Sequence, residues 1–260
     1  MNTTNEVTNT EVIILAGGFG TRLQSEVAHL PKPMAPIAGR PFLTYLLDSL
    51  ANQGTRHVII TVHHMAAKIM ALGSHYKGMA ITYSIEKTPL GTGGAIIQAL
   101  KKIKGKNALV INGDTYLDLD LRSILRNFKE SESGMMIAVT KVAHCNRYST
   151  IRINSKKEII GFDLPNEEKS EGLINAGVYV ISKKIFNGFH FPASFSFEVD
   201  FLSPYIKKIR VLAYQCDGYF VDIGVPDDYR LADRQIPNVV SARAISPQLF
   251  QQDFGRVVCC

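Results

Sequence analysis

The sequence is poor in cysteine and has no long apolar run. Its cysteines show neither metal-ligand spacing nor the framework of a small disulfide-linked protein; they are Cys145, Cys216, Cys259 and Cys260. We expect Cys145 and Cys216 to be reduced thiols. No apolar run approaches the roughly 20 residues that cross a bilayer, and the polar residues 1–10 lack the charged-then-apolar order of a secretory signal. The sequence therefore predicts a cytoplasmic protein without a membrane partner, with a disordered leader over residues 1–10.

The usual motifs of covalent and zinc-dependent catalysis are also absent. There is no Gly-x-Ser-x-Gly, no His-Glu-x-x-His and no cysteine beside a candidate base. His63 and His64 follow an apolar run, and adjacent side chains of an extended chain point to opposite sides. We therefore expect these histidines at a surface or a pocket wall rather than on one metal ion.

Positive charge exceeds negative charge, but it is not concentrated. The formal net charge is +6, and the densest cluster is KKIKGK at residues 101–106, at the end of a predicted helix. A solvated helix end explains this cluster better than a nucleic-acid site does. A modest positive balance suits a small anionic substrate. We expect no nucleic-acid partner, and the sequence leaves the oligomeric state open, a homo-oligomer included.

Strand-like and helix-like segments alternate in the first half of the chain, which predicts an α/β fold with a parallel sheet. Apolar runs of strand length occupy residues 11–17, 57–62, 80–86 and 108–114, and helical spacing occupies residues 41–54, 65–76 and 93–103. Later strands are expected over residues 134–142, 148–162 (a pair around a turn at 154–157), 173–182, 210–216 and 219–224, with a helix over 196–208. The central sheet is therefore expected to be mixed, with a smaller β-rich part, in one continuous domain. Residues 236–260 have weak periodicity and are expected to form a loosely packed extension of unknown role.

A glycine-rich loop follows the first predicted strand. In LAGGFGTRL, residues 15–23, the glycines are Gly17, Gly18 and Gly20, and Arg22 comes next. Bare backbone lets N–H groups approach an anion, and an arginine supplies a permanent charge with a fork that matches phosphate oxygens. The order of residues is that of neither a Walker A loop nor a dinucleotide-binding Gly-x-Gly-x-x-Gly. Alone, the loop is explained equally well as a tight turn.

Other segments turn this loop into a candidate site. Lys32 lies between prolines on a stiff segment, and a second glycine-rich turn occupies residues 86–95. Asp114 and Asp222 each end a predicted strand. A single carboxylate there would more often cap a helix, but two could hold one Mg²⁺, an ion that takes a few carboxylates together with substrate phosphates.

In this order, six segments make the chain similar to the sugar-1-phosphate nucleotidyltransferase family. They are residues 15–23, 31–43, 86–95, 112–114, 171–180 and 220–229. The resemblance covers residues 11–235 as one nucleotidyltransferase domain and implies a Rossmann-like sheet with a sugar-binding β-rich part. Within the family, residues 30–37, 84–95 and 196–202 are most similar to guanylyltransferases acting on D-glycero-D-manno-heptose 1-phosphate.

The resemblance implies a magnesium-dependent reaction in which a nucleoside triphosphate and a sugar 1-phosphate give a nucleotide sugar and pyrophosphate, for surface polysaccharide synthesis. We expect GTP and D-glycero-α-D-manno-heptose 1-phosphate as substrates. The alternatives are a uridylyltransferase or other nucleotidyltransferase acting on a different hexose 1-phosphate, and a regulator that binds sugar nucleotides without catalysis. An NAD-dependent oxidoreductase is disfavoured, because no acidic residue follows the strand at residues 57–62.

The resemblance also implies a role for each site residue. Phosphate binding falls on Gly17, Gly18, Gly20, Arg22 and Lys32, base and ribose binding on Leu15, Ala16, Glu86, Pro89 and Gly91, and Thr21 and Thr92 are further nucleotide-binding residues. The metal aspartates are Asp114 and Asp222, which with Arg22 and Lys32 form the catalytic set. The sugar pocket comprises Gly113, Glu171, Asn175, Ala176, Gly177 and Glu198. The chain departs from the family where a Glu-Lys pair normally contacts the acceptor; Lys169, or Glu171 with Asn175, is expected to replace it.

Overall fold

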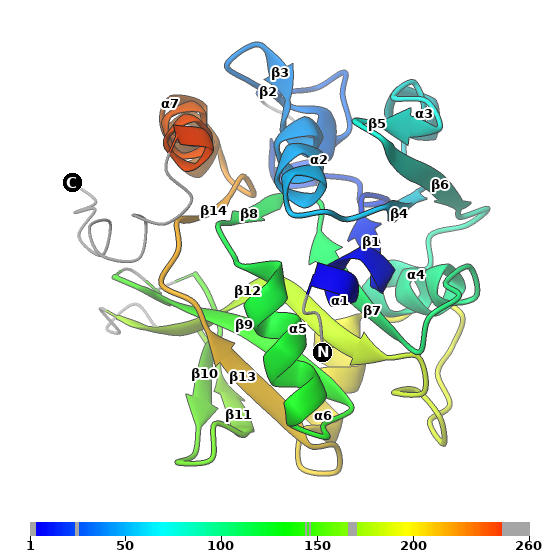
Figure 1. The fold of residues 1–260 in the computed structure, drawn as a ribbon, viewed down its shortest axis with the longest axis vertical. Coiled ribbons are helices and arrows are strands. Elements are labelled where there is room, and N and C mark those ends of the chain that lie inside the picture. Colours follow the sequence, from blue (N-terminus) through cyan, green and yellow to red (C-terminus); the bar gives the residue numbers. More distant parts are fainter. Residues whose placement is uncertain (1–3, 24–25, 144, 146, 166–170, 246–260) are drawn as a thin grey trace.

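A ten-stranded mixed sheet forms the centre of the computed structural model, which describes residues 4–23, 26–143, 145, 147–165 and 171–245 (Figure 1). The strands run in the order β11-β10-β12-β7-β1-β4-β6-β5, and β9 joins β12 to β13. The neighbours β7, β1, β4 and β6 are parallel, while β12 is antiparallel to β7. The bounds are β1 Glu11–Leu15, β4 His57–Val62, β5 His75–Tyr76, β6 Met79–Ile85, β7 Asn107–Asn112, β9 Met135–Val142, β10 Thr150–Ile153, β11 Ile159–Asp163, β12 Gly172–Ser182 and β13 Val211–Gln215.

Helices cover both faces of this sheet, as near-continuous apolar strands require. The alternation along β1 shows the two faces: Val12 and Ile14 belong to one core cluster and Ile13 to the other. The first cluster receives side chains from α1 (Thr4–Asn9), α2 (Phe42–Asn52), α3 (Ala66–Met70), α5 (Leu121–Glu130) and α7 (Pro226–Ile245). The second receives them from α4 (Gly91–Leu100) and from the π-helix η3 (Phe197–Leu202), which continues into α6 (Ser203–Tyr205).

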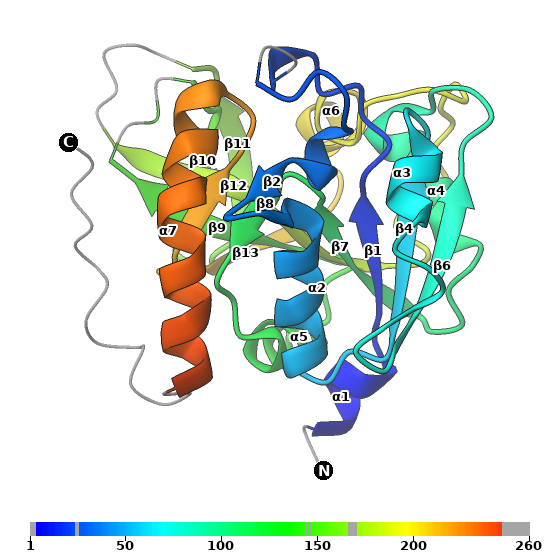
Figure 2. The same cartoon turned by 90° about the horizontal axis from the view of Figure 1, so that it is seen from above.

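Two small sheets and two 3-10 turns complete the fold. A hairpin pairs β2 (Pro36–Ile37) with β3 (Arg40–Pro41), and β8 (Thr115–Leu117) pairs with β14 (Phe220–Asp222). The 3-10 turns are η1 (Thr21–Leu23) and η2 (Lys32–Met34). Figure 2 shows β2 between α7 and α2 on one side of the sheet. No helix of the described segments has both the length and the apolar character of a membrane span.

The structure confirms a mixed, mostly parallel sheet flanked by helices and changes several boundaries. The expectation of a disordered leader is wrong for residues 4–9, which form α1; its Val7 is 3% exposed and its Glu6 pairs with Lys129 of α5, so an apolar and an ionic contact attach it. Helix α7 runs across the expected boundary at residue 236. The expected helix over residues 65–76 ends at Met70, and residues 75–76 form β5. Residues 246–260, with Cys259 and Cys260, lie outside the described segments.

Candidate functional site

Asp114 and Asp222, 108 positions apart, lie side by side because of the small β8–β14 sheet. Asp114 follows β7 and precedes β8, and the pairing of β14 with β8 sets Asp222 opposite Thr115. The Ile223 N–H donates to the Asp114 carbonyl at 3.0 Å. The expectation that Asp222 ends a strand is confirmed, although that strand belongs to the two-stranded sheet rather than to the central one.

The Lys32 ammonium bridges the two carboxylates. Its Nζ lies 2.5 Å from Asp114 Oδ2 and 3.7 Å from Asp222 Oδ1. Lys32 lies in η2 between Pro31 and Pro33, and its side chain is 11% exposed. Burial raises the pKa of Asp222, and the neighbouring charge of Asp114 raises it further. The site therefore concentrates negative charge around one cation.

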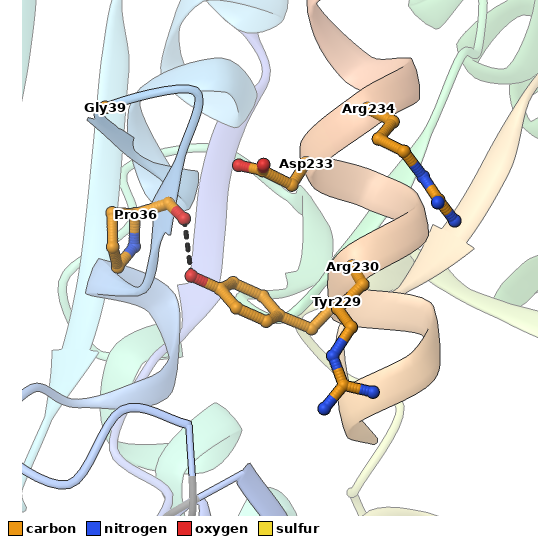
Figure 3. Close-up of a pocket in the computed structure, with 6 residues that line it drawn as sticks. All are labelled: Pro36, Gly39, Tyr229, Arg230, Asp233 and Arg234. Carbon is orange, nitrogen blue, oxygen red and sulfur yellow. Dashed lines mark hydrogen bonds between the residues drawn. The ribbon is translucent and has the colours of Figure 1, made fainter.

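The hairpin that follows Lys32 is held by α7. The Tyr229 hydroxyl donates to the Pro36 carbonyl at 2.6 Å, and Asp233 Oδ1 accepts from the Ala38 N–H at 2.7 Å (Figure 3). Pro36, Gly39, Tyr229, Arg230, Asp233 and Arg234 line a groove of about 500 Å³ there. None of them belongs to the site expected from the sequence, so this contact supports the Lys32 segment from outside.

The first glycine loop approaches the same place. Gly20 has φ +61°, and a Cβ built on it would lie 3.0 Å from Lys32 Cβ, so a glycine is required where the loop passes that side chain. A Cβ on Gly18 would meet nothing within 4 Å, so protein packing does not explain that glycine. Thr21 and Arg22 begin η1 with exposed side chains. Arg22 forms no ion pair with another described residue; the structure brings its turn, but not its guanidinium, to the carboxylates.

Glu86 is a buried carboxylate beside the glycine loop. It is 7% exposed, and its Oε2 accepts from the Leu90 N–H at 3.1 Å. A Cβ on Gly17 would lie 2.7 Å from Glu86 Oε1, so the missing side chain makes room for that oxygen. Burial raises the pKa of Glu86, and the Leu90 hydrogen bond opposes the rise. Leu15 and Ala16 connect β1 to this loop; the Ala16 side chain is in the core, so only its backbone can face a ligand.

The glycines of the second turn pack against the segment that leads into η3. Gly91 has φ +64°, and a Cβ on it would lie 2.4 Å from the Phe195 carbonyl oxygen. The Gly93 N–H donates to that carbonyl at 3.0 Å, and Thr92 Oγ1 accepts from the Phe197 N–H at 2.8 Å. Pro89 in the same turn is exposed. These glycines therefore allow the segment leading into η3 to lie against the start of α4.

That segment carries Glu198 into a hydrogen-bond network with Asn175 and Tyr179. Glu198 Oε1 accepts from Asn175 Nδ2 and from the Tyr179 hydroxyl, both at 2.7 Å, and Tyr179 OH also accepts from Asn175 at 2.8 Å. The register of β12 with β9 shifts between Asn175, which pairs with Val139, and Tyr179, so the strand is irregular directly after Asn175. Gly177, at φ +70°, donates its N–H to Asn175 Oδ1 at 3.0 Å.

Three further residues expected in the sugar pocket have different surroundings. Ala176 is fully buried in the first core cluster, so its side chain cannot line a pocket. Gly113 is a glycine because a Cβ would lie 2.5 Å from the Leu15 carbonyl oxygen, where β1 and β7 end together. Glu171 is exposed and pairs with Lys141 at 2.9 Å, outside the Asn175 network. Lys169 lies outside the described residues.

The carboxylate pair fits a small divalent cation. In the described part of the chain no group of three or more His, Cys, Asp or Glu side chains is placed to hold a metal. Two carboxylates around a cation, here the Lys32 ammonium, are nevertheless the donor set that Mg²⁺ takes when substrate phosphates and water complete its shell.

The sequence did not identify Tyr179, Arg147 or Tyr148 as site residues. In the sequence Tyr179 is an aromatic residue of a predicted strand without a further signal. In the structure it follows the register shift in β12, and its hydroxyl donates to Glu198. Arg147 precedes a predicted strand that Tyr148 begins, and the charge of Arg147 acts on Asp222 through tertiary contacts alone. An Arg-Tyr pair carries no spacing signal that separates it from a surface loop.

Known proteins resemble this chain over most of its length. A family model described as nucleotidyl transferase matches residues 11–238. The D-glycero-alpha-D-manno-heptose 1-phosphate guanylyltransferase of Campylobacter jejuni is 43% identical over 223 residues, covering 84% of this chain and 96% of the relative. The protein of the same name from Aneurinibacillus thermoaerophilus is 41% identical over 234 residues, covering 88% and 100%.

A solved structure has the same fold. HddC from Yersinia pseudotuberculosis, complexed with GMP-PN, superposes with a TM-score of 0.75 at 36% identity, covering 86% of this chain and 98% of that one. The family match spans the glycine loop, the Lys32 turn and both aspartates. The chain therefore belongs to the nucleotidyl transferase family.

Proposed function

We propose that the protein transfers a guanylyl group from GTP to D-glycero-α-D-manno-heptose 1-phosphate, giving the GDP-sugar and pyrophosphate. The observation that carries the proposal is the meeting of Lys32, Asp114 and Asp222 beside the first glycine loop. The names of the two relatives above 40% identity support both the base and the sugar. Because the reaction consumes GTP, the proposed location is the cytoplasm.

The proposed reaction brings two highly charged molecules together. A phosphate oxygen of the sugar 1-phosphate attacks the α-phosphorus of GTP, a P–O bond forms there, and the bond to the pyrophosphate oxygen breaks. Unit charges 4 Å apart repel by about 4 kcal/mol at an intermediate dielectric, so cations must offset the repulsion. Lys32, Arg22 and the N–H groups of the glycine loop would bind the triphosphate and align it. The attacking oxygen is already ionised, so no general base is required.

Asp114 and Asp222 would hold the Mg²⁺ of this reaction. When bound, the ion would supply charge neutralisation to the phosphate oxygens of both substrates. The support is the geometry of two converging carboxylates with a cation between them. Since Lys32 contacts both carboxylates, its ammonium would turn from them toward the triphosphate as the ion enters.

Glu86 would select guanine. A carboxylate accepts hydrogen bonds only, and guanine presents two adjacent donors, N1–H and the 2-amino group, that it can accept together. Glu86 Oε2 already accepts from Leu90, whereas Oε1 faces the open side of Gly17. Adenine presents an acceptor at N1, and uracil has one ring donor flanked by carbonyls, so neither pairs with a carboxylate in this way. Asn175 and Glu198 would contact sugar hydroxyls from the other side.

Pyrophosphate release from four nucleoside triphosphates combined with several sugar 1-phosphates tests this proposal. We expect turnover with GTP and the heptose 1-phosphate, dependent on Mg²⁺ and lost on chelation. Glu86→Gln should lower kcat/KM for GTP by about 10- to 100-fold, since an amide cannot accept both guanine donors; Lys87→Gln, on the neighbouring exposed side chain, is the matched control. A preference for UTP and another hexose 1-phosphate would support the uridylyltransferase alternative, and binding without turnover would support a regulator.

A further inference from the structure

A second cation lies beside the carboxylate pair, in the segment between β9 and β10. The charges of Lys32 and Arg147 both act on the Asp222 carboxylate. Arg147 pairs with Asp228, in the first turn of α7, six positions after Asp222. Its side chain is 31% exposed, so it stands at the rim of the carboxylate site and remains accessible to a ligand.

The Arg147 guanidinium is held in position by Tyr148. It lies over the Tyr148 ring at 4.5 Å from the centroid and donates to the Tyr148 hydroxyl. Tyr148 in turn contacts the ring of Phe220, two residues before Asp222, at 6.3 Å. Burial, together with the charge of Asp222, raises the pKa of Tyr148 to about 12, so its hydroxyl remains a donor. Contacts with uncharged aromatic rings thus orient the guanidinium, and these rings do not offset its positive charge.

This segment joins the two halves of the proposed site. Thr150, three residues after Arg147, pairs with Ile174, immediately before Asn175. Asn175 belongs to the network expected to contact the sugar, whereas Phe220 and Asp228 flank the metal carboxylate Asp222. A sugar 1-phosphate with its hydroxyls at Asn175 and its phosphate near Asp222 would therefore pass alongside Arg147.

In the proposed reaction Lys32 and Arg22 bind the triphosphate, so the acceptor phosphate requires a further cation. Glu171 is paired with Lys141 on the strand edge, and Lys32 is committed to the two aspartates and, in the proposed reaction, to the triphosphate. A sugar phosphate dianion beside two carboxylates needs a positive charge of its own. A guanidinium suits this purpose, because its fork binds two phosphate oxygens at once.

We propose that Arg147 binds the phosphate of the sugar 1-phosphate, exchanging Asp228 for phosphate oxygens when the acceptor enters. The proposal rests on the proposed function and names the residue that provides the acceptor-phosphate contact. Without acceptor, Asp228 pairs with the guanidinium and keeps it at the rim of the site. The sugar phosphate is a dianion, and its higher charge displaces Asp228 from the guanidinium. The competing explanation is that the Arg147–Asp228 pair only fastens the segment to α7.

Arg147→Met distinguishes the two explanations. We expect its KM for the heptose 1-phosphate to rise about 10- to 100-fold, with the KM for GTP within about twofold of wild type. Calorimetric titration of the heptose 1-phosphate should show the same loss of affinity. Asp228→Asn should not weaken acceptor binding, since it removes the competing carboxylate. Arg152→Met, which removes an exposed arginine paired with Asp163, is the matched control.

Equal losses of melting temperature in Arg147→Met and Asp228→Asn, with an unchanged acceptor KM and affinity, would overturn the proposal in favour of a structural ion pair. A rise in the GTP KM alone would overturn it too, by assigning the guanidinium to the triphosphate. Should Arg147→Met fail to fold, Arg147→Gln is measured in the same way. Absence of turnover by the wild type would contradict the proposed function instead; the titration still tests Arg147, because it requires binding only.

Discussion

Removing the Lys32 charge should destabilise the protein in the absence of metal, and Mg²⁺ should restore most of the loss. Lys32→Met deletes the ammonium that lies 2.5 Å and 3.7 Å from the two carboxylates. Breaking a buried ion pair from one side costs about 3–5 kcal/mol. The side chains of Asp114 and Asp222 are 35% and 22% exposed, so solvent screens part of the uncompensated charge. We therefore expect the free energy of unfolding to fall by about 1–3 kcal/mol.

The assay is urea unfolding of wild type and variant, with EDTA and with saturating Mg²⁺. In the variant, Mg²⁺ meets no competing ammonium, so its stabilisation should exceed that of the wild type; a concentration 100-fold above Kd contributes about 2.7 kcal/mol. Lys183→Met is the matched control, because Lys183 Nζ donates to the neutral Ile103 carbonyl at 2.9 Å. Equal stability of wild type and Lys32→Met without metal, or an equal gain on adding Mg²⁺, would refute the reasoning.

Three further predictions concern the start of β1 and the two glycine-rich turns. Burial raises the pKa of Glu11, but hydrogen bonds from Gly105, His57 and Lys104 lower it below its ordinary value overall; its stabilisation is therefore present above about pH 4.5 and is lost as pH falls through the lowered pKa. Glu11→Gln should cost about 1–2 kcal/mol at pH 6, and a difference from wild type that stays constant in urea melts down to pH 3 would contradict this. Gly91→Ala should cost about 3 kcal/mol or more, because its φ is +64° and the new Cβ would meet a backbone oxygen at 2.4 Å. Gly18→Ala should leave the melting temperature nearly unchanged while weakening GTP binding; equal melting temperatures for both alanine variants would contradict the packing argument.

The sequence predicted the first glycine loop, Lys32 and the two aspartates because each has a local signal. Glycines after an apolar strand, a lysine between prolines and carboxylates at strand ends can all be read without tertiary contacts. Their meeting was also predictable, since the ends of parallel strands share one edge of a sheet. The structure adds that Asp222 reaches that edge through the small β14–β8 pairing.

Contacts between distant segments could not be predicted in this way. The glycines of residues 91–94 look like part of a nucleotide site in the sequence, but their missing side chains make room for Ala193 and Phe195. The Asn175 network depends on a register shift in β12, which no residue pattern marks. Helix α1 buries Val7 in the core, although the composition of its segment is otherwise typical of disorder.

The three side chains of the cation bridge come from the beginning, the middle and nearly the end of the folded chain, and this sets an order of events during synthesis. A ribosome-bound polypeptide has its loop and Lys32 early, yet Asp222 and the Tyr229 contact that steadies the Lys32 hairpin emerge only with the last helix. The nascent chain should therefore stay inert until residue 222 has emerged, and release of the chain before that residue should yield a product with most of the sheet but without activity.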